Sequence, residues 1–222
     1  NVSHSKRGLG VDSNRLAGVS AGNFNVFRQE QVTKAPNTAI TLLIDRSGSM
    51  NFDGITIGGI SYGQGFKMKV ANEAAFALSK GIDALPGASC EVLYYPFSRH
   101  TELHVAKRFN EKSTSTQQYF KMTADEGTPT GQAMQVALQR LAIRPEPRKM
   151  LFVITDGDPS YDQIDLVEQS LTEADLLKID VVAFGVCTSN VKGFEESGFV
   201  HVDDVSQLNV AIKDAIKQKL LK

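Results

Sequence analysis

Three uninterrupted runs of apolar residues constrain the fold of this chain more than any other feature of its sequence. The runs read ITLLI, MLFVIT and DVVAFGV, and they lie within residues 38–45, 149–155 and 179–186. A strand with one face in water alternates apolar and polar residues, whereas continuous apolar strands are typical of sheets that helices cover on both faces. These runs therefore predict a central, mostly parallel sheet.

Segments with helical periodicity alternate with the expected strands. Residues 66–84, for example, place Val70, Ala74 and Leu78 on one face of a helix. The pattern predicts four helices, at 66–84, 130–142, 162–177 and 206–221, and three further strands, at 90–97, 102–107 and 199–202. Alternating strands and helices indicate an α/β domain with a doubly wound, mostly parallel central sheet flanked by helices.

The N-terminal segment lacks this alternation. Residues 1–37 contain many Gly, Ser and Asn residues without periodicity, which predicts an extension that is extended or partly disordered. Within it, VFRQEQVTKAP predicts a short edge strand before the domain proper. We expect the α/β domain to occupy residues 38–222, a length that is ordinary for one domain.

Charge and composition exclude several classes of partner. The chain has 24 Lys and Arg against 25 Asp and Glu, so its net charge of −1 does not favour nucleic acid. No apolar run reaches the roughly 20 residues that span a membrane, and no signal-peptide pattern is recognisable. Cys90 and Cys187 fall in expected strands without disulfide-framework spacing, which predicts buried, reduced thiols. We therefore expect a cytoplasmic protein with no membrane or nucleic-acid partner.

Oxygen-bearing side chains stand where the expected strands end. Asp45 closes the first apolar run and is followed by RSGS, residues 46–49. Asp156 follows the second run, and Thr128 precedes the second helix. Because doubly wound domains bind ligands beyond the carboxyl ends of their strands, we expect these loops to meet at one edge of the sheet. The predicted cluster comprises Asp45, Ser47, Ser49, Thr128 and Asp156.

The predicted cluster contains only oxygen donors. Without a thiol or an imidazole it does not favour soft metals or zinc, whereas carboxylates and hydroxyls suit Mg²⁺ or Mn²⁺. Two carboxylates leave such an ion electrophilic, so that a carboxylate of a protein partner can complete its coordination shell. The alternative for Asp45, Ser47, Thr128 and Asp156, each taken singly, is a helix cap, since Ser, Thr and Asp are favoured there. Capping does not explain two serines together with an aspartate at the end of a buried strand.

The order of these residues resembles a known family. Asp45-x-Ser47-x-Ser49, a threonine within GTPTG and VITDGD at the end of the next apolar strand resemble a von Willebrand factor type A domain. The likeness extends from about residue 38 to 221. It implies a Rossmann-like fold with a metal-ion-dependent adhesion site at the top of the sheet. By this resemblance the hydroxyl ligands are Ser47, Ser49 and Thr128, with Thr130 a weaker candidate, and Asp45 and Asp156 bind directly or through water.

A narrower likeness concerns the partner. LAIRPEPRKMLFVITDGDPSYD and FVHVDDVSQLNVAIKDAI are similar to segments of the intracellular type A domains in the T-type subunit of aerobic cobaltochelatase. Those domains work beside AAA+ ATPase partners in inserting cobalt into a corrin ring. The resemblance therefore implies an AAA+ ATPase as a partner of this chain.

Two classes of function fit these observations. The first is a non-enzymatic protein-binding module, in which an Asp or Glu of the partner completes the shell of a divalent cation. The second class is enzymatic, either a component of a cobaltochelatase-like metal-insertion complex or a Mg²⁺-dependent phosphate hydrolase. A hydrolase would need a second acid two residues after Asp45, where Ser47 stands, so we favour the module.

Overall fold

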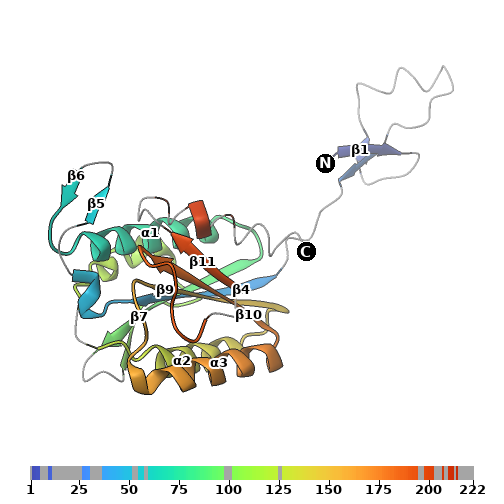
Figure 1. Ribbon diagram of the computed structural model, residues 1–222. Coiled ribbons are helices and arrows are strands. Elements are labelled where there is room, and N and C mark those ends of the chain that lie inside the picture. Colours follow the sequence, from blue (N-terminus) through green and yellow to red (C-terminus); the bar gives the residue numbers. More distant parts are fainter. Residues whose placement is uncertain are drawn as a thin grey trace. The chain divides into compact units, whose positions relative to one another are not determined.

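Two compact units, Asn1–Lys34 and Ala35–Lys222, make up the chain in the computed structural model of Figure 1. The five residues of the predicted cluster all belong to the second unit and to the part of the chain that the structure describes. The described residues are 2–5, 10–11, 27–30, 37–51, 55–57, 60–97, 102–124, 127–194, 198–202, 207, 210–212 and 214.

A six-stranded sheet forms the centre of the second unit. Its order is β11-β10-β9-β4-β7-β8; the first five strands are parallel, and β8 is antiparallel to β7. This order confirms the predicted doubly wound, mostly parallel sheet. The strands are β4 (Thr38–Asp45), β7 (Ala88–Phe97), β8 (Glu102–Lys107), β9 (Arg148–Thr155), β10 (Ile179–Val186) and β11 (Gly198–Val202).

Helices cover both faces of this sheet. In Figure 1, α1 lies on one face, and α2 and α3 lie together on the other. Their bounds are α1 (Phe66–Asp83), α2 (Thr130–Ala142) and α3 (Ile164–Leu176), close to the predicted ones. The fourth expected helix, at 206–221, lies largely outside the described residues. In this range the structure describes 210–212 and 214 as helical. Within the described part of the chain, no helix combines the length and apolarity needed to cross a membrane.

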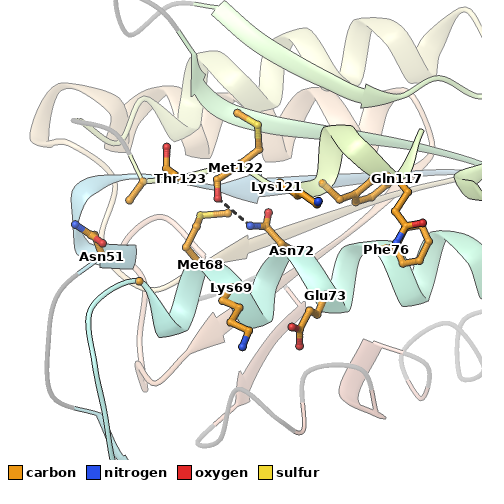
Figure 2. Close-up of a pocket in the computed structure, with 13 residues that line it drawn as sticks. Asn51, Met68, Lys69, Asn72, Glu73, Phe76, Gln117, Lys121, Met122 and Thr123 are labelled. Atoms are coloured by element: carbon orange, nitrogen blue, oxygen red, sulfur yellow. Dashed lines mark hydrogen bonds between the residues drawn. The ribbon is translucent and has the colours of Figure 1, made fainter. Parts of the chain in front are cut away.

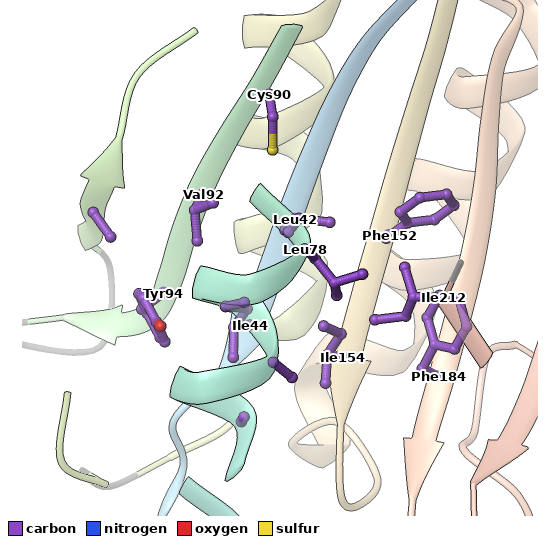
Figure 3. Close-up of a cluster of buried hydrophobic side chains, with 14 of the residues drawn as sticks. Leu42, Ile44, Leu78, Cys90, Val92, Tyr94, Phe152, Ile154, Phe184 and Ile212 are labelled. Carbon is purple, nitrogen blue, oxygen red and sulfur yellow. The ribbon is translucent and has the colours of Figure 1, made fainter. Parts of the chain in front are cut away.

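The central strand β4 explains why the apolar runs are continuous. All of its residues are buried, and alternate side chains enter the two layers of the core. Leu42 and Ile44 pack in one cluster with Leu78 of α1, as Figure 3 shows. Leu43, which lies between them in the sequence, belongs to the cluster on the side of α2 and α3. A strand buried on both faces has no position for a solvated side chain.

A small hairpin precedes α1. The sequence ITIGGISYG predicts a hairpin that turns at its central glycines. In the structure β5 (Ile55–Ile57) pairs antiparallel with β6 (Ile60–Tyr62), with Ile57 opposite Ile60. This register confirms the predicted turn, although Gly58 and Gly59 themselves lie outside the described residues.

The first unit contains a three-stranded antiparallel sheet. Its strands are β1 (Val2–Ser5), β2 (Gly10–Val11) and β3 (Phe27–Glu30), with β3 in the middle. The prediction of an edge strand in VFRQEQVTKAP is therefore wrong in its pairing, because β1 and β2 take both hydrogen-bonding edges of β3. The other residues of this unit lie outside the described part, so the extended or partly disordered character of residues 1–37 stays a prediction.

The two cysteines have different surroundings, and they do not form a disulfide with each other. Cys90 on β7 is buried as predicted, and burial raises the pKa of its thiol to about 12. Cys187 is exposed, so the prediction of burial is wrong at this position. The reason is that β10 ends at Val186, so that Cys187 lies just past the strand with φ 55°, although its N–H still donates to the Val202 carbonyl oxygen.

A buried ion pair ties the end of α1 to β8. The side chain of Lys107 is fully buried, and its Nζ lies 3.1 Å from Asp83 Oδ1 and donates to the Cys90 carbonyl oxygen at 2.6 Å. The other carboxylate oxygen of Asp83 accepts hydrogen bonds from Ser113 N and Oγ at 2.7 and 2.6 Å. Partial burial raises the pKa of Asp83, but the hydrogen bonds from Ser113 and Lys107 outweigh burial and lower the pKa below 3.8.

We expect Asp83→Asn to lower the free energy of unfolding by about 3 kcal/mol at pH 7, since it leaves the Lys107 ammonium buried without its counter-charge. The folded state depresses the pKa of Asp83, so this stabilisation is fully present above pH 3.8 and is lost as the pH falls through the folded pKa. Urea denaturation of both proteins at several pH values measures the difference, which should narrow toward low pH.

Arg108→Gln is the matched control for this ion pair. Arg108 forms an exposed pair with Glu111 on the neighbouring loop. Such surface pairs contribute about 0.5 kcal/mol or less, so this variant should unfold almost as the wild type does. Equal losses in the two variants would contradict a special role for the buried pair.

Candidate metal centre

Asp45, the last residue of β4, is the most deeply buried residue of the predicted cluster. Its side chain is inaccessible to solvent, and each carboxylate oxygen accepts a hydrogen bond. Oδ1 accepts from the backbone N–H of Ser47 at 2.7 Å, and Oδ2 accepts from Thr155 Oγ1 at 2.6 Å. Because Thr155 ends the neighbouring strand β9, the two strands together fix the position of the carboxylate.

The two predicted serines stand side by side in a tight turn. Gly48–Asn51 forms one turn of 3₁₀ helix, in which Met50 N donates to the Ser47 carbonyl oxygen at 3.0 Å. Met50 is completely buried in the core beneath α1 and anchors this turn. As a result, Ser47 Oγ and Ser49 Oγ lie 3.0 Å apart.

Asp156, which directly follows β9, contacts the second of these serines. Ser49 Oγ donates to Asp156 Oδ1 at 2.5 Å, across 107 positions of sequence. The other oxygen, Oδ2, accepts from the ammonium of Lys67 in α1 at 2.6 Å. Ser47, Ser49 and Asp156 therefore form one hydrogen-bonded chain that begins beside the carboxylate of Asp45.

The electrostatics of these hydrogen-bonded side chains favour the binding of a cation. Burial raises the pKa of Asp45 from 3.8 to about 7; the negative charge of Asp156 adds to the shift, and hydrogen bonds from Thr155 and Ser47 oppose it. Within the described residues no cluster of three or more His, Cys, Asp or Glu side chains is present. A metal ion here would therefore need the serine hydroxyls, and this all-oxygen donor set fits a hard dication.

Thr128 lies in a loop that is tied to the loop after Asp156. Its backbone N–H donates to Ser160 Oγ at 3.2 Å, and Ser160 N donates to the Thr128 carbonyl oxygen at 3.0 Å. These bonds place Thr128 beside the loop that follows β9. Thr130 differs, because its hydroxyl lies 3.2 Å from Tyr95 OH and is buried there. That the Thr128 hydroxyl completes the cluster remains a prediction.

Helix capping does not account for these residues. The N-cap positions of α1, α2 and α3 are Gly65, Pro129 and Gln163, and none of them makes a side-chain cap hydrogen bond. None of the predicted cluster residues is therefore the N-cap of one of these α-helices. The alternative that each is simply a cap is therefore wrong for these three α-helices.

Gly131, the last residue of GTPTG, allows the loop of Thr128 to lie where it does. A Cβ atom at this position would lie 2.4 Å from Leu166 Cβ and 2.9 Å from the Gln163 carbonyl oxygen. Only glycine allows the start of α2 to pack this closely against the start of α3. Gln132 N also donates to Gln163 Oε1 at 3.2 Å, so the two helices hold their loops together.

Sequence reasoning missed two residues of this centre. Thr155 could have been found, because it is the polar end of the run MLFVIT and a buried hydroxyl needs a partner. Lys67 gives no such signal, since one lysine among several in an amphipathic helix looks like a solvated side chain.

A cavity of about 510 Å³ opens next to the serine turn. Figure 2 shows it between α1 and residues 117–124, with Asn51 at the end that belongs to the 3₁₀ turn. The side chains of Met68, Phe76 and Met122 contribute much of its apolar lining, and Asn72 Nδ2 donates to the Met122 carbonyl oxygen at 2.8 Å. The surface beside the candidate centre is therefore concave.

Comparison with known families identifies the domain. The family model described as the von Willebrand factor type A domain matches residues 39–209. This chain belongs to that family. Type A domains are metal-dependent protein-interaction modules. A search of curated proteins gives no match.

Several solved structures share the fold of this domain. The PilB minor pilin from Streptococcus sanguinis, as its D319A mutant, is 14% identical with a TM-score of 0.67, over 86% of this chain and 63% of PilB. This chain thus spans less than two thirds of that pilin. The vWF domain of the type V pili tip protein Mfa5 from Porphyromonas gingivalis is 13% identical with a TM-score of 0.62, over 84% and 96% of the two chains.

A third neighbour contains a metal. Proximal thread matrix protein 1 from the mussel byssus, described with a zinc-occupied MIDAS motif, is 14% identical with a TM-score of 0.63, over 85% of this chain and 47% of that one. At such low identity these three structures show the shared fold alone.

We expect Thr155→Val to lower the free energy of unfolding by about 1–3 kcal/mol, because it leaves Asp45 Oδ2 buried without its donor. Valine keeps the volume of threonine, so the effect reports the lost hydrogen bonds of the hydroxyl, to Asp45 and to the backbone of Gly157. The control is Thr172→Val on the exposed face of α3, which should change stability by no more than about 0.5 kcal/mol. Urea denaturation in buffer with chelator measures both, and equal stabilities would contradict the role given to Thr155.

Proposed function

We propose that this domain is a non-enzymatic, divalent-cation-dependent protein-binding module. Its ligands to Mg²⁺ or Mn²⁺ are the predicted cluster, Asp45, Ser47, Ser49, Thr128 and Asp156. A partner supplies an Asp or Glu carboxylate to complete the shell. The observation that carries this proposal is the hydrogen-bonded chain from Ser47 through Ser49 to Asp156, which gathers hydroxyls and a carboxylate at the end of the central strand.

The chemistry of the donor set supports this choice of ion and partner. Hydroxyl and carboxylate oxygens are ligands for hard cations, which keep open positions for water or for a further oxygen ligand. When bound, the ion would supply a Lewis-acidic position that an external carboxylate can take. The zinc described in the mussel neighbour is a property of that protein, and the oxygen donors of this chain favour Mg²⁺ or Mn²⁺ over zinc.

A binding role fits the serines better than a catalytic one. In the described structure their hydroxyls bond to each other and to Asp156, with no imidazole among these partners to act as a general base.

For the phosphate-hydrolase alternative, we expect no Mg²⁺-dependent phosphatase turnover above background, either in the wild type or in Asp45→Ala. Turnover that disappears in Asp45→Ala would favour the hydrolase instead.

The partner class rests on the sequence resemblance to the cobaltochelatase subunit. That resemblance supports an AAA+ ATPase, and with it a cytoplasmic adaptor or a component of a cobaltochelatase-like metal-insertion complex. Two of the three structural neighbours described above are proteins of pili, which are surface structures. Affinity capture from the native host, in Mg²⁺ and in chelator, distinguishes a cytoplasmic role from a role at the cell surface. Capture of an ATPase only in Mg²⁺ supports the first, and capture of a surface protein only in Mg²⁺ supports the second.

Ser47→Ala tests the metal site directly. A dication that binds only the folded protein should stabilise the wild type by about 2.7 kcal/mol at a free concentration one hundred times Kd. In Ser47→Ala most of this stabilisation should disappear, while the melting temperature in chelator stays close to that of the wild type. The control is Ser115→Ala, which removes an exposed hydroxyl far along the chain. An undiminished shift in Ser47→Ala would place the metal elsewhere.

Substitutions of two neighbouring threonines test whether Thr128 is a metal ligand. Thr128→Ala should weaken Mg²⁺ binding by about tenfold or more, since even residues that only support a ligand contribute that much. Thr130→Ala should leave the affinity nearly unchanged and lower stability instead, because its hydroxyl pairs with Tyr95 OH. Isothermal titration calorimetry measures the Mg²⁺ affinities. A larger loss of affinity in Thr130→Ala than in Thr128→Ala would assign the ligand to Thr130.

A further inference from the structure

Lys67 places an ammonium group in the candidate metal centre. Its Nζ lies 2.6 Å from Asp156 Oδ2, with the Lys67 side chain 16% exposed and the Asp156 side chain fully buried. Asp156 Oδ1 accepts from Ser49 Oγ at the same time. The ammonium therefore contacts one of the two carboxylates of the predicted metal site.

Helix stability does not explain a lysine at this position. Lys67 is the second residue of α1, and the amino end of a helix favours anions over cations. The first turn of α1 contains no acidic residue, and Gly65 at the N-cap makes no side-chain hydrogen bond. The contact with Asp156 does explain it, because a buried carboxylate needs a charged or hydrogen-bonding partner.

We propose that Lys67 is a built-in competitor of the divalent cation. It holds the carboxylate of Asp156 in the metal-free protein and raises the cation concentration at which the centre fills. This inference rests on the proposed function, since it takes Asp45 and Asp156 as metal ligands. A dication that binds Asp156 must either displace the Lys67 ammonium or bind against its repulsion, and both weaken binding.

This competition links metal uptake to partner binding. A partner carboxylate adds negative charge to the centre, which favours the dication over the single charge of Lys67. Metal and partner then strengthen each other's binding, because the coupling between two ligands of one site is reciprocal. Lys67 therefore keeps the affinity of the centre for the dication low until the cation concentration is high enough or a partner carboxylate binds.

Isothermal titration with MgCl₂ and MnCl₂ tests the role of Lys67. Lys67→Gln removes the charge but keeps an N–H donor for Asp156, so the carboxylate stays paired. We expect this variant to bind Mg²⁺ roughly tenfold more tightly than the wild type. Lys67→Arg keeps the positive charge and should bind more weakly than Lys67→Gln.

Lys69→Gln is the matched control. Lys69 lies on the same first turn of α1, is exposed, and lines the neighbouring cavity in Figure 2. Its charge is screened by solvent, so its removal should change the Mg²⁺ affinity by no more than about threefold.

Thermal unfolding gives a second readout that needs no partner. In EDTA, Lys67→Gln should melt below the wild type, because Asp156 loses its counter-charge. In saturating Mg²⁺ the difference should close or reverse, because the ion then supplies the positive charge.

The outcomes separate this inference from the proposed function. If the wild type binds Mg²⁺ and Lys67→Gln binds it equally or more weakly, the role of Lys67 is overturned and the metal site stands. An equal gain in affinity in Lys67→Gln and Lys69→Gln would reflect general surface charge and would also overturn it. If neither the wild type nor Lys67→Gln takes up Mg²⁺ or Mn²⁺, the inference and the proposed function both fail.

Discussion

The burial of Asp45 at the end of the central strand is the constraint on which the candidate centre depends. β4 pairs in parallel with β7 on one side and β9 on the other, so its last residue is held by the sheet. The buried carboxylate must find donors, and it takes one from the end of β9 and one from the backbone of Ser47. The same hydrogen bonds therefore fix both the acid and the start of the serine turn.

The other loops of the centre are positioned by packing. Met50 anchors the serine turn in the core beneath α1, and Gly131 lets α2 and α3 approach closely enough to hold the Thr128 and Ser160 loops together. Sites that rest on strands and packed helices keep their geometry better than sites on free loops. The rigid parts of the fold thus bring together hydroxyls and carboxylates that are more than one hundred residues apart in the sequence.

Charge balance gives the centre its chemical character. Two buried carboxylates share a small region, and the nearby ammonium of Lys67 neutralises only part of their charge. Arg46, although next to Asp45 in the sequence, directs its Nε to the Thr123 carbonyl oxygen at 2.8 Å. In the function proposed above, a divalent cation supplies the remaining charge and the partner contacts the concave surface beside the serine turn.

Much of the fold and part of the site could be predicted from the sequence, for a physical reason. Strands buried on both faces must be continuously apolar, so ITLLI, MLFVIT and DVVAFGV by themselves determined the sheet, and the polar residues at their ends indicated where a site would lie. Only the tertiary structure decided which hydroxyls and acids touch, that Lys67 reaches Asp156, that β3 pairs within its own unit and that Cys187 is exposed. Periodicity reports the average environment of a segment, whereas individual contacts depend on how distant segments pack against each other.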